Sequence, residues 1–226
     1  MNRLYKTLQV TSVVALAFVA LTGSALANPV LDFKTGNADQ GGLVQLFSDG
    51  NVSGTAIPIG RLSVTGAPSG NGGYLINGNA TDSSGFTYGA LSFSTGGLAG
   101  GNYIEIDGYI ASAGIGSAGS PVALLTGTFS NFSLNFDPLN NTYNGVGNAV
   151  GWALASPLAT LVGLSTDLQY TFLGWSMTTD PMVVGTPGTA ISTDIRATAV
   201  PEPGSLLLMG SGLFFAVGSA RRRFNA

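Results

Sequence analysis

The sequence contains no cysteine and no histidine, and only 8% of its 226 residues are charged. Without cysteine the chain can form neither a disulfide framework nor a thiolate metal site. Without histidine it lacks the commonest metal ligand and the commonest general base. Soluble domains usually carry about 25% charged residues, so most of the polarity here must come from Ser, Thr, Asn and Gly.

Positive charge is scarce in the central part of the chain. Five of the eight Lys and Arg residues lie within six residues of an end, which leaves Lys34, Arg61 and Arg196 in residues 28–199. Nine Asp and Glu105 oppose them there, a formal net charge of −7. Such a region disfavours nucleic acid as a partner, and it disfavours other anionic polymers unless a divalent cation bridges them.

The first 27 residues have the pattern of a secretory signal peptide. Arg3 and Lys6 precede an apolar run over residues 13–21, and Ala25 and Ala27 form a small-x-small cleavage site. Nine apolar residues are too few to span a hydrocarbon core of about 30 Å. The sequence therefore predicts export through the secretion machinery, with cleavage before Asn28.

The last 27 residues, 200–226, form a second targeting segment. A short motif, Val200, Pro201, Glu202 and Pro203, precedes an apolar run over residues 206–220. That run would form a helix about 22 Å long, which is short for a permanent membrane span. Arg221, Arg222 and Arg223 follow it and would hold the far end in the cytoplasm as a stop-transfer signal.

These three parts in this order resemble the PEP-CTERM sorting signal. The resemblance implies recognition and cleavage near the Pro-Glu-Pro segment by an exosortase-type membrane protease. It also implies a Gram-negative bacterium that makes exopolysaccharide. The product would be anchored transiently in the inner membrane and then released to, or attached at, the cell surface.

Residues 28–199 are predicted to form one all-β domain. Apolar and polar residues alternate in short segments that Gly-rich turns separate, which favours an antiparallel β-sandwich or jelly roll of about eight to ten strands. The segment 128–136 places Phe132, Leu134 and Phe136 on one strand face, which we expect to be buried. A short helix is expected after Pro157, within a stretch that alternates poorly.

The strongest candidate site lies on one predicted strand face, where Tyr103, Glu105 and Asp107 alternate with apolar residues. Glu105-Ile-Asp107 resembles half of the Glu-x-Asp-x-x-Glu strand of laminarinase-like glycosidases, but Ile110 stands where the second Glu should be. Glycosidases usually need two carboxyl groups at a fixed separation. We therefore predict no catalytic residues, and we take these three side chains as candidate ligand contacts.

No cofactor is predicted, and calcium is the open alternative. Asp137 with Asn140 and Asn141 offers hard oxygen ligands, and so does Asp107 if it lies beside the Gly-rich stretch 96–101. Neither set has the spacing of an EF-hand. Asp and Asn in loops more often form turns through bonds to the backbone.

The sequence as a whole predicts a secreted or cell-surface protein with a structural or adhesive role in the exopolysaccharide layer. The first alternative is a carbohydrate-binding module with a defined ligand. An ice-binding protein would need a regular Thr array, whereas Thr126 and Thr128 form a single pair. A glycosidase would need a second carboxylate that another strand brings close to Glu105.

Overall fold

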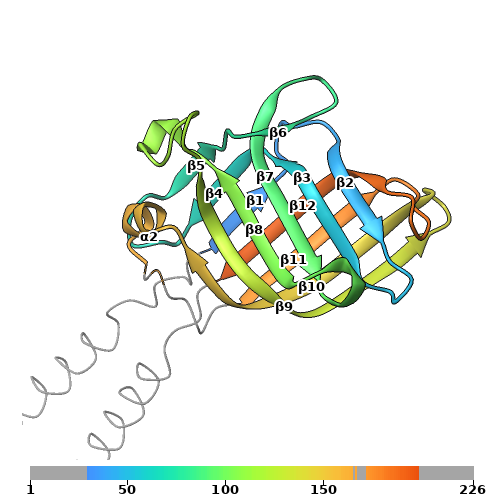
Figure 1. Cartoon of the computed structure of the whole chain (residues 1–226). Helices are drawn as coiled ribbons and strands as arrows, with labels where there is room; N and C mark the ends of the chain where they lie inside the picture. Colours follow the sequence, from blue (N-terminus) through green and yellow to red (C-terminus); the bar gives the residue numbers. More distant parts are fainter. Residues whose placement is uncertain (1–29, 165, 167–171, 199–226) are drawn as a thin grey trace, which may run out of the picture. The chain divides into compact units, whose positions relative to one another are not determined.

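The computed structural model describes residues 30–164, 166 and 172–198 (Figure 1). Most of these residues lie in strands, because alternating side chains let each strand bury one face and solvate the other. The strands of the described part are β1 (Val30–Lys34), β2 (Gly41–Leu46), β3 (Val52–Ile59), β4 (Arg61–Thr65), β5 (Gly72–Leu75), β6 (Ala80–Thr81), β7 (Thr87–Thr95), β8 (Asn102–Gly108), β9 (Val122–Asp137), β10 (Thr142–Leu154), β11 (Phe172–Thr179) and β12 (Gly188–Thr198). Two 3₁₀ turns, η1 (Gly97–Ala99) and η2 (Ala111–Ala113), and the helix α2 (Ser156–Val162) accompany them.

Eight of the described strands close into an antiparallel barrel. They follow the order β11-β10-β9-β8-β7-β3-β2-β12, and the ring closes because β12 also pairs with β11. Strands β1, β4 and β5 extend the sheet from β12, and β6 pairs with β7.

The prediction of an antiparallel all-β fold is confirmed, but its finer form, a two-sheet sandwich or jelly roll, is not. The described strands instead form one sheet, eight strands of which close into a ring. Alternation fixes which side chains of a strand are buried, and it is equally satisfied by two facing sheets or by one closed sheet.

Strand β12 holds the two ends of the described domain together. Its first residues pair with β2, its last five pair with β1 on the same edge, and its other edge pairs with β11. Val30 lies opposite Thr198 in this register. The first and last described residues are therefore neighbours in the sheet.

Aromatic side chains fill the barrel interior. Phe93 of β7, Phe129 and Phe132 of β9, and Trp175 of β11 form a cluster whose contacting ring centroids lie 4.9–6.0 Å apart. Strands β7 and β11 are four positions apart in either direction around the ring, so the 4.9 Å contact between Phe93 and Trp175 joins opposite walls. Eight strands enclose a space that side chains can just fill, and at this level the interior is packed core.

Glycines on the neighbouring strands make room for these rings. A Cβ on Gly54 of β3 would lie 2.1 Å from Cε1 of Phe93. On β10, a Cβ on Gly145 would lie 3.3–3.4 Å from the rings of Phe132 and Trp175. Some of the many glycines are therefore required by core packing, because glycine in a strand commonly marks a place where another group lies very close to the backbone.

A bulge in β9 changes which of its side chains face inward. The register with β10 shifts between Asn148 and Ala149, whose partners on β9 are Asn131 and Phe129. Phe129 and Phe132 consequently lie on the same side although they are three residues apart, as expected when one extra residue interrupts a ladder.

The expectation of a buried face on this strand is right for two side chains and wrong for the third. Phe132 and Leu134 are half-buried against the core, whereas Phe136 is 49% exposed. Phe136 contacts Tyr143 on the neighbouring strand, close to the hairpin that joins β9 to β10. It lies outside the buried cluster because β9 extends beyond the core toward that hairpin.

Helix α2 confirms the predicted helix in the region of Pro157. Pro157 lies in its first turn, where the missing N–H costs nothing. Gly163 ends the helix in a left-handed conformation, with φ 69°. Leu158, Ala159 and Val162 bury one face of the helix.

Candidate functional site

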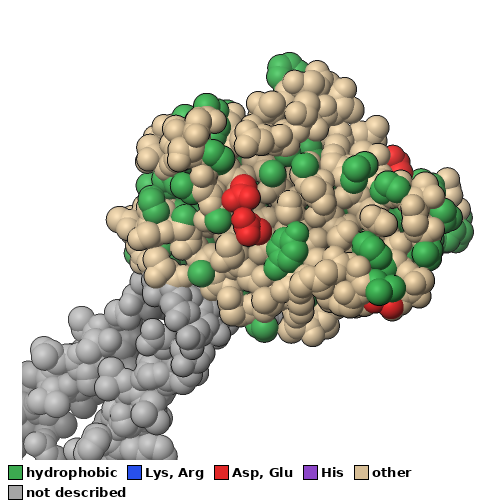
Figure 2. All heavy atoms as spheres, in the orientation of Figure 1, with side chains coloured by type: hydrophobic (Ala, Val, Ile, Leu, Met, Phe, Trp, Pro, Cys, Tyr) green, Lys and Arg blue, Asp and Glu red, His purple; other side chains and the backbone are tan. Residues whose placement is uncertain are grey.

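The three predicted ligand-contact residues lie together on the outer face of β8. Their neighbours Ile104 and Ile106 point into the core. Tyr103 is 40% exposed, and Glu105 and Asp107 are half-buried. Figure 2 shows two acidic side chains side by side over β8, the strand that carries this pair.

The surroundings of Glu105 are hydroxyl groups of the adjacent strands. Its register partners are Ser92 on β7 and Thr126 on β9. Burial, followed by the charge and hydrogen bonding of Asp107, raises the pKa of Glu105 above its usual range. The paired registers bring no second carboxylate of β7 or β9 opposite Glu105, as a glycosidase pair would require.

Glu105→Gln is expected to raise the melting temperature at pH 7 and to change it much less near pH 4. A carboxyl group whose pKa is raised by folding stabilises the folded state below its unfolded pKa of about 4.3, where it is protonated. This stabilisation is lost as the pH rises through the pKa of the folded state. The neutral Gln side chain has no such loss. Thermal unfolding from pH 4 to pH 8 measures the difference.

Asp137→Asn is the matched variant, and we expect it to change the melting temperature in the opposite direction. Hydrogen bonds from the Asn140 side chain and the Leu139 backbone lower the pKa of Asp137, so this variant should lower the melting temperature at pH 7. If the difference in melting temperature between Glu105→Gln and the unsubstituted protein were the same from pH 4 to pH 8, the expectation would be wrong.

The candidate calcium ligands at the β9–β10 hairpin bind one another. Asp137 accepts hydrogen bonds from the backbone N–H of Leu139 at 2.9 Å and from the amide of Asn140 at 2.7 Å. Asn141 adopts a left-handed conformation with φ 51°. This is the geometry of a turn stabilised by its own side chains.

The second calcium candidate is not assembled as expected. Asp107 lies near the end of β8, whereas the Gly-rich stretch 96–101 precedes the beginning of that strand. Asp49 binds that stretch instead, because it accepts the backbone N–H of Leu98 at 2.7 Å. Among the described residues, no three acidic side chains gather closely enough to hold a metal ion.

The two tryptophans belong to the core. Trp152 is 1% exposed and Trp175 is 3% exposed, so neither offers a face on which a sugar could stack. Tyr103, the aromatic residue of the predicted ligand contacts, is 40% exposed and keeps a face that a sugar could contact.

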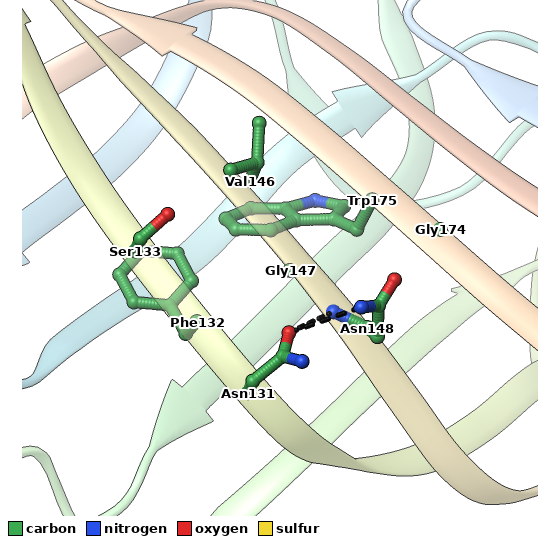
Figure 3. Close-up of a pocket in the computed structure, with 8 residues that line it drawn as sticks. All are labelled: Asn131, Phe132, Ser133, Val146, Gly147, Asn148, Gly174 and Trp175. Carbon is green, nitrogen blue, oxygen red and sulfur yellow. Dashed lines mark hydrogen bonds between the residues drawn. The ribbon is translucent and has the colours of Figure 1, made fainter.

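Sequence reasoning missed a groove on the outer face of β9, β10, β11, β12 and β1, which we call the outer groove. Its first part is a depression of about 320 Å³ (Figure 3). It is lined by the surface side chains of Asn131, Ser133, Val146 and Asn148, by the core residues Phe132 and Trp175, and by Gly147 and Gly174. Figure 3 shows Asn131 and Asn148 facing each other across two strands. The side-chain oxygen of Asn131 accepts the backbone N–H of Asn148 at 3.1 Å and its amide at 3.2 Å.

The second part of the outer groove is a depression of about 500 Å³ that continues the first across Val146, which lines both. It passes over β11 and β12 to the end of β1. Its polar side chains are Lys34, Thr35, Asn144, Ser176, Thr178, Ser192, Thr193 and Asp194. Thr178 donates a hydrogen bond of 3.0 Å to the side-chain oxygen of Asn144.

Charges at the far end of the outer groove compensate one another. Lys34 forms an ion pair with Asp32 at 2.5 Å, and it lies opposite Asp194 in the β1–β12 register. Burial, followed by hydrogen bonding to Asp32 and its charge, raises the pKa of Asp194. The only signal for the outer groove in the sequence was the run of Asn, Ser and Thr at alternate positions, which strand surfaces show in general.

The predicted targeting residues lie outside the described residues. They are Ala25 and Ala27 at the signal cleavage site, Val200, Pro201, Glu202 and Pro203 in the sorting motif, and Arg221, Arg222 and Arg223 at the end. In the part of the chain that the structure describes, no helix has the length and apolar character needed to cross a bilayer.

Comparison with known proteins identifies the tail alone. No curated protein and no solved structure matches the chain. Residues 199–223 match the family described as the PEP-CTERM protein-sorting motif. The motif indicates an exported protein that is anchored transiently in the membrane, processed by exosortase and then displayed at the surface. The chain therefore carries a PEP-CTERM sorting motif at its C-terminal end.

Proposed function

We propose that this protein is a non-catalytic structural or adhesive component of the exopolysaccharide layer. The observation that carries the proposal is the sorting motif at residues 199–223. The signal peptide predicted over residues 1–27 supports export, and the tail predicted over residues 200–226 supports a short membrane helix before processing. Between them, residues 28–199 would be the part displayed outside the cell.

The packing of the barrel supports a role that its outer surface performs. Rings from opposite walls are in contact inside the barrel, so the interior at that level is filled by the protein's own side chains. The outer surface carries few charges and includes exposed apolar side chains such as Leu75, Phe86 and Leu139, which suits contact with an uncharged polymer. Calcium is not required by this role.

The surroundings of Glu105 support a non-catalytic role for this residue. Hydroxyl groups of Ser92 and Thr126 lie opposite it, and its nearest carboxyl partner is Asp107 on the same strand. Hydrolysis with retention or inversion usually needs a carboxyl pair that flanks the bond from two sides. Tyr103, Glu105 and Asp107 remain a proposed contact surface for a ligand.

Intact-mass spectrometry of the protein extracted from the cell surface tests the proposal. We expect a species that begins at Asn28 and lacks Arg221, Arg222 and Arg223. Replacing both Pro201 and Pro203 with Ala should impair processing, because the tail helix could then extend backward through the motif.

Pro138→Ala is the matched control, because Pro138 is an exposed proline in the β9–β10 hairpin. It should leave the mature mass unchanged apart from the substitution itself. A surface species that still contains Arg223 would contradict exosortase processing, and a protein confined to the inner membrane would overturn the proposed role.

A further inference from the structure

We propose that the outer groove binds a single chain of a neutral polysaccharide. This inference rests on the proposed function and names the ligand class and the surface that would carry it. The two depressions share Val146 and together cross five adjacent strands, β9, β10, β11, β12 and β1. At about 4.8 Å between strands the outer groove is about 19 Å long, which suits an extended polymer more than a single sugar.

The lining of the outer groove offers both donors and acceptors at fixed positions. The hydrogen bonds that orient Asn131 and Asn144 use their side-chain oxygens. Within the described part of the chain, their amide NH₂ groups therefore remain free to donate to a ligand. The hydroxyls of Ser133, Ser176 and Ser192 can both donate and accept, and all three side chains are exposed. Sugar hydroxyls need this mixture.

The charges around the outer groove favour an uncharged ligand. Lys34 is already paired with Asp32, and Asp194 lies beside both. An acidic polymer would meet these carboxylates as well as the −7 charge of residues 28–199. A cationic polymer would have to compete with Lys34 and with Arg196, which lies opposite Asp32 in the register.

Two other ligand classes fit the lining poorly. An extended peptide usually binds by adding a strand to a free sheet edge, whereas the outer groove lies on the face of strands that already pair on both sides. A lipid needs a continuous apolar surface. Besides the exposed Val146, the large apolar residues that line the outer groove are Phe132, Trp175 and Met177, and these three pack in or against the core.

Affinity electrophoresis tests the proposal with the full-length chain in mild detergent. The probes are dextran and hydroxyethyl cellulose as neutral glucans and alginate as an acidic polysaccharide, each cast into native gels. The unsubstituted protein should be retarded in at least one neutral gel and not in the alginate gel. Ser176→Trp, which places a large ring in the middle of the outer groove, should weaken that retardation at least tenfold.

Thr55→Trp is the matched control, because Thr55 is an exposed residue of β3 on another part of the barrel. It should bind as the unsubstituted protein does. Asn144→Ala removes an amide donor without adding bulk and should weaken binding severalfold, so it covers the case in which Ser176→Trp misfolds. Equal retardation of both Trp variants, retardation only by alginate, or no retardation in either neutral gel would overturn the proposal.

Surface retention in cells separates this proposal from the proposed function. Ser176→Trp protein that stays at the surface as well as the unsubstituted protein would leave the structural role standing, even if the gels show that the outer groove binds nothing. Unsubstituted protein that is processed but not retained at the surface would overturn the proposed function whatever the gels show.

Discussion

Phe129→Ala is expected to lower the free energy of unfolding by about 3–5 kcal/mol, the usual cost of removing a buried aromatic side chain. Phe129 is 6% exposed and contacts three other rings, Phe93, Phe132 and Trp175. Its loss would remove transfer free energy and leave a cavity between strands whose backbones cannot collapse together. Urea denaturation followed by tryptophan fluorescence measures the change.

Phe136→Ala is the matched control on the same strand. This ring is 49% exposed and contacts Tyr143 outside the core cluster, so its loss should cost less than about 1 kcal/mol. Similar losses for the two variants would mean that β9 is not buried as described, and that its bulge does not direct Phe129 inward.

Gly54→Ala is expected to destabilise the barrel by about 1–3 kcal/mol or more, as overpacking of a tight core does. The added methyl group would lie 2.1 Å from Cε1 of Phe93 and 2.8 Å from Cδ1 of Ile57. Phe93 is fully buried and contacts Phe129 and Trp175, so its ring cannot rotate away without moving the cluster. Denaturant melts measure the effect.

Gly101→Ala provides the control, since a Cβ there meets no atom within 4 Å and the backbone is not left-handed. Its unfolding free energy should change by no more than about 0.5 kcal/mol. In a Phe93→Leu background, the cost of Gly54→Ala should fall, because the smaller side chain removes the clash. An unchanged cost in that background would show that Phe93 is not the obstacle.

The sequence predicted local structure well because alternation acts within a single strand. In the segment 128–136 alternation correctly placed Phe132 and Leu134 on one face, and the turn that begins at Asp137 joins two long strands. Glu105 and Asp107 share a face because side chains two residues apart on a strand point the same way.

Closure of the sheet and the position of the outer groove could not be predicted, because both depend on which strands pair. The contact between Phe93 and Trp175 joins strands that are far apart in sequence and opposite in the barrel. The outer groove combines side chains of five strands, and none of those segments is unusual by itself. The bulge that separates Phe129 from the regular alternation is visible only against its partner strand.

The place of β12 in the sheet has a mechanical consequence for a protein that is tethered through its C-terminal end. A force applied through the residues that follow Thr198 in the sequence would reach the domain at β12, its last strand. Eight register pairs with β11 and five with β1 flank this strand. A force along the strand axis would load their hydrogen bonds together in shear, because these bonds run perpendicular to the strands, instead of opening them one after another as in a peeled hairpin. A domain pulled in this direction would resist unfolding better than one whose last strand could be peeled from a single edge.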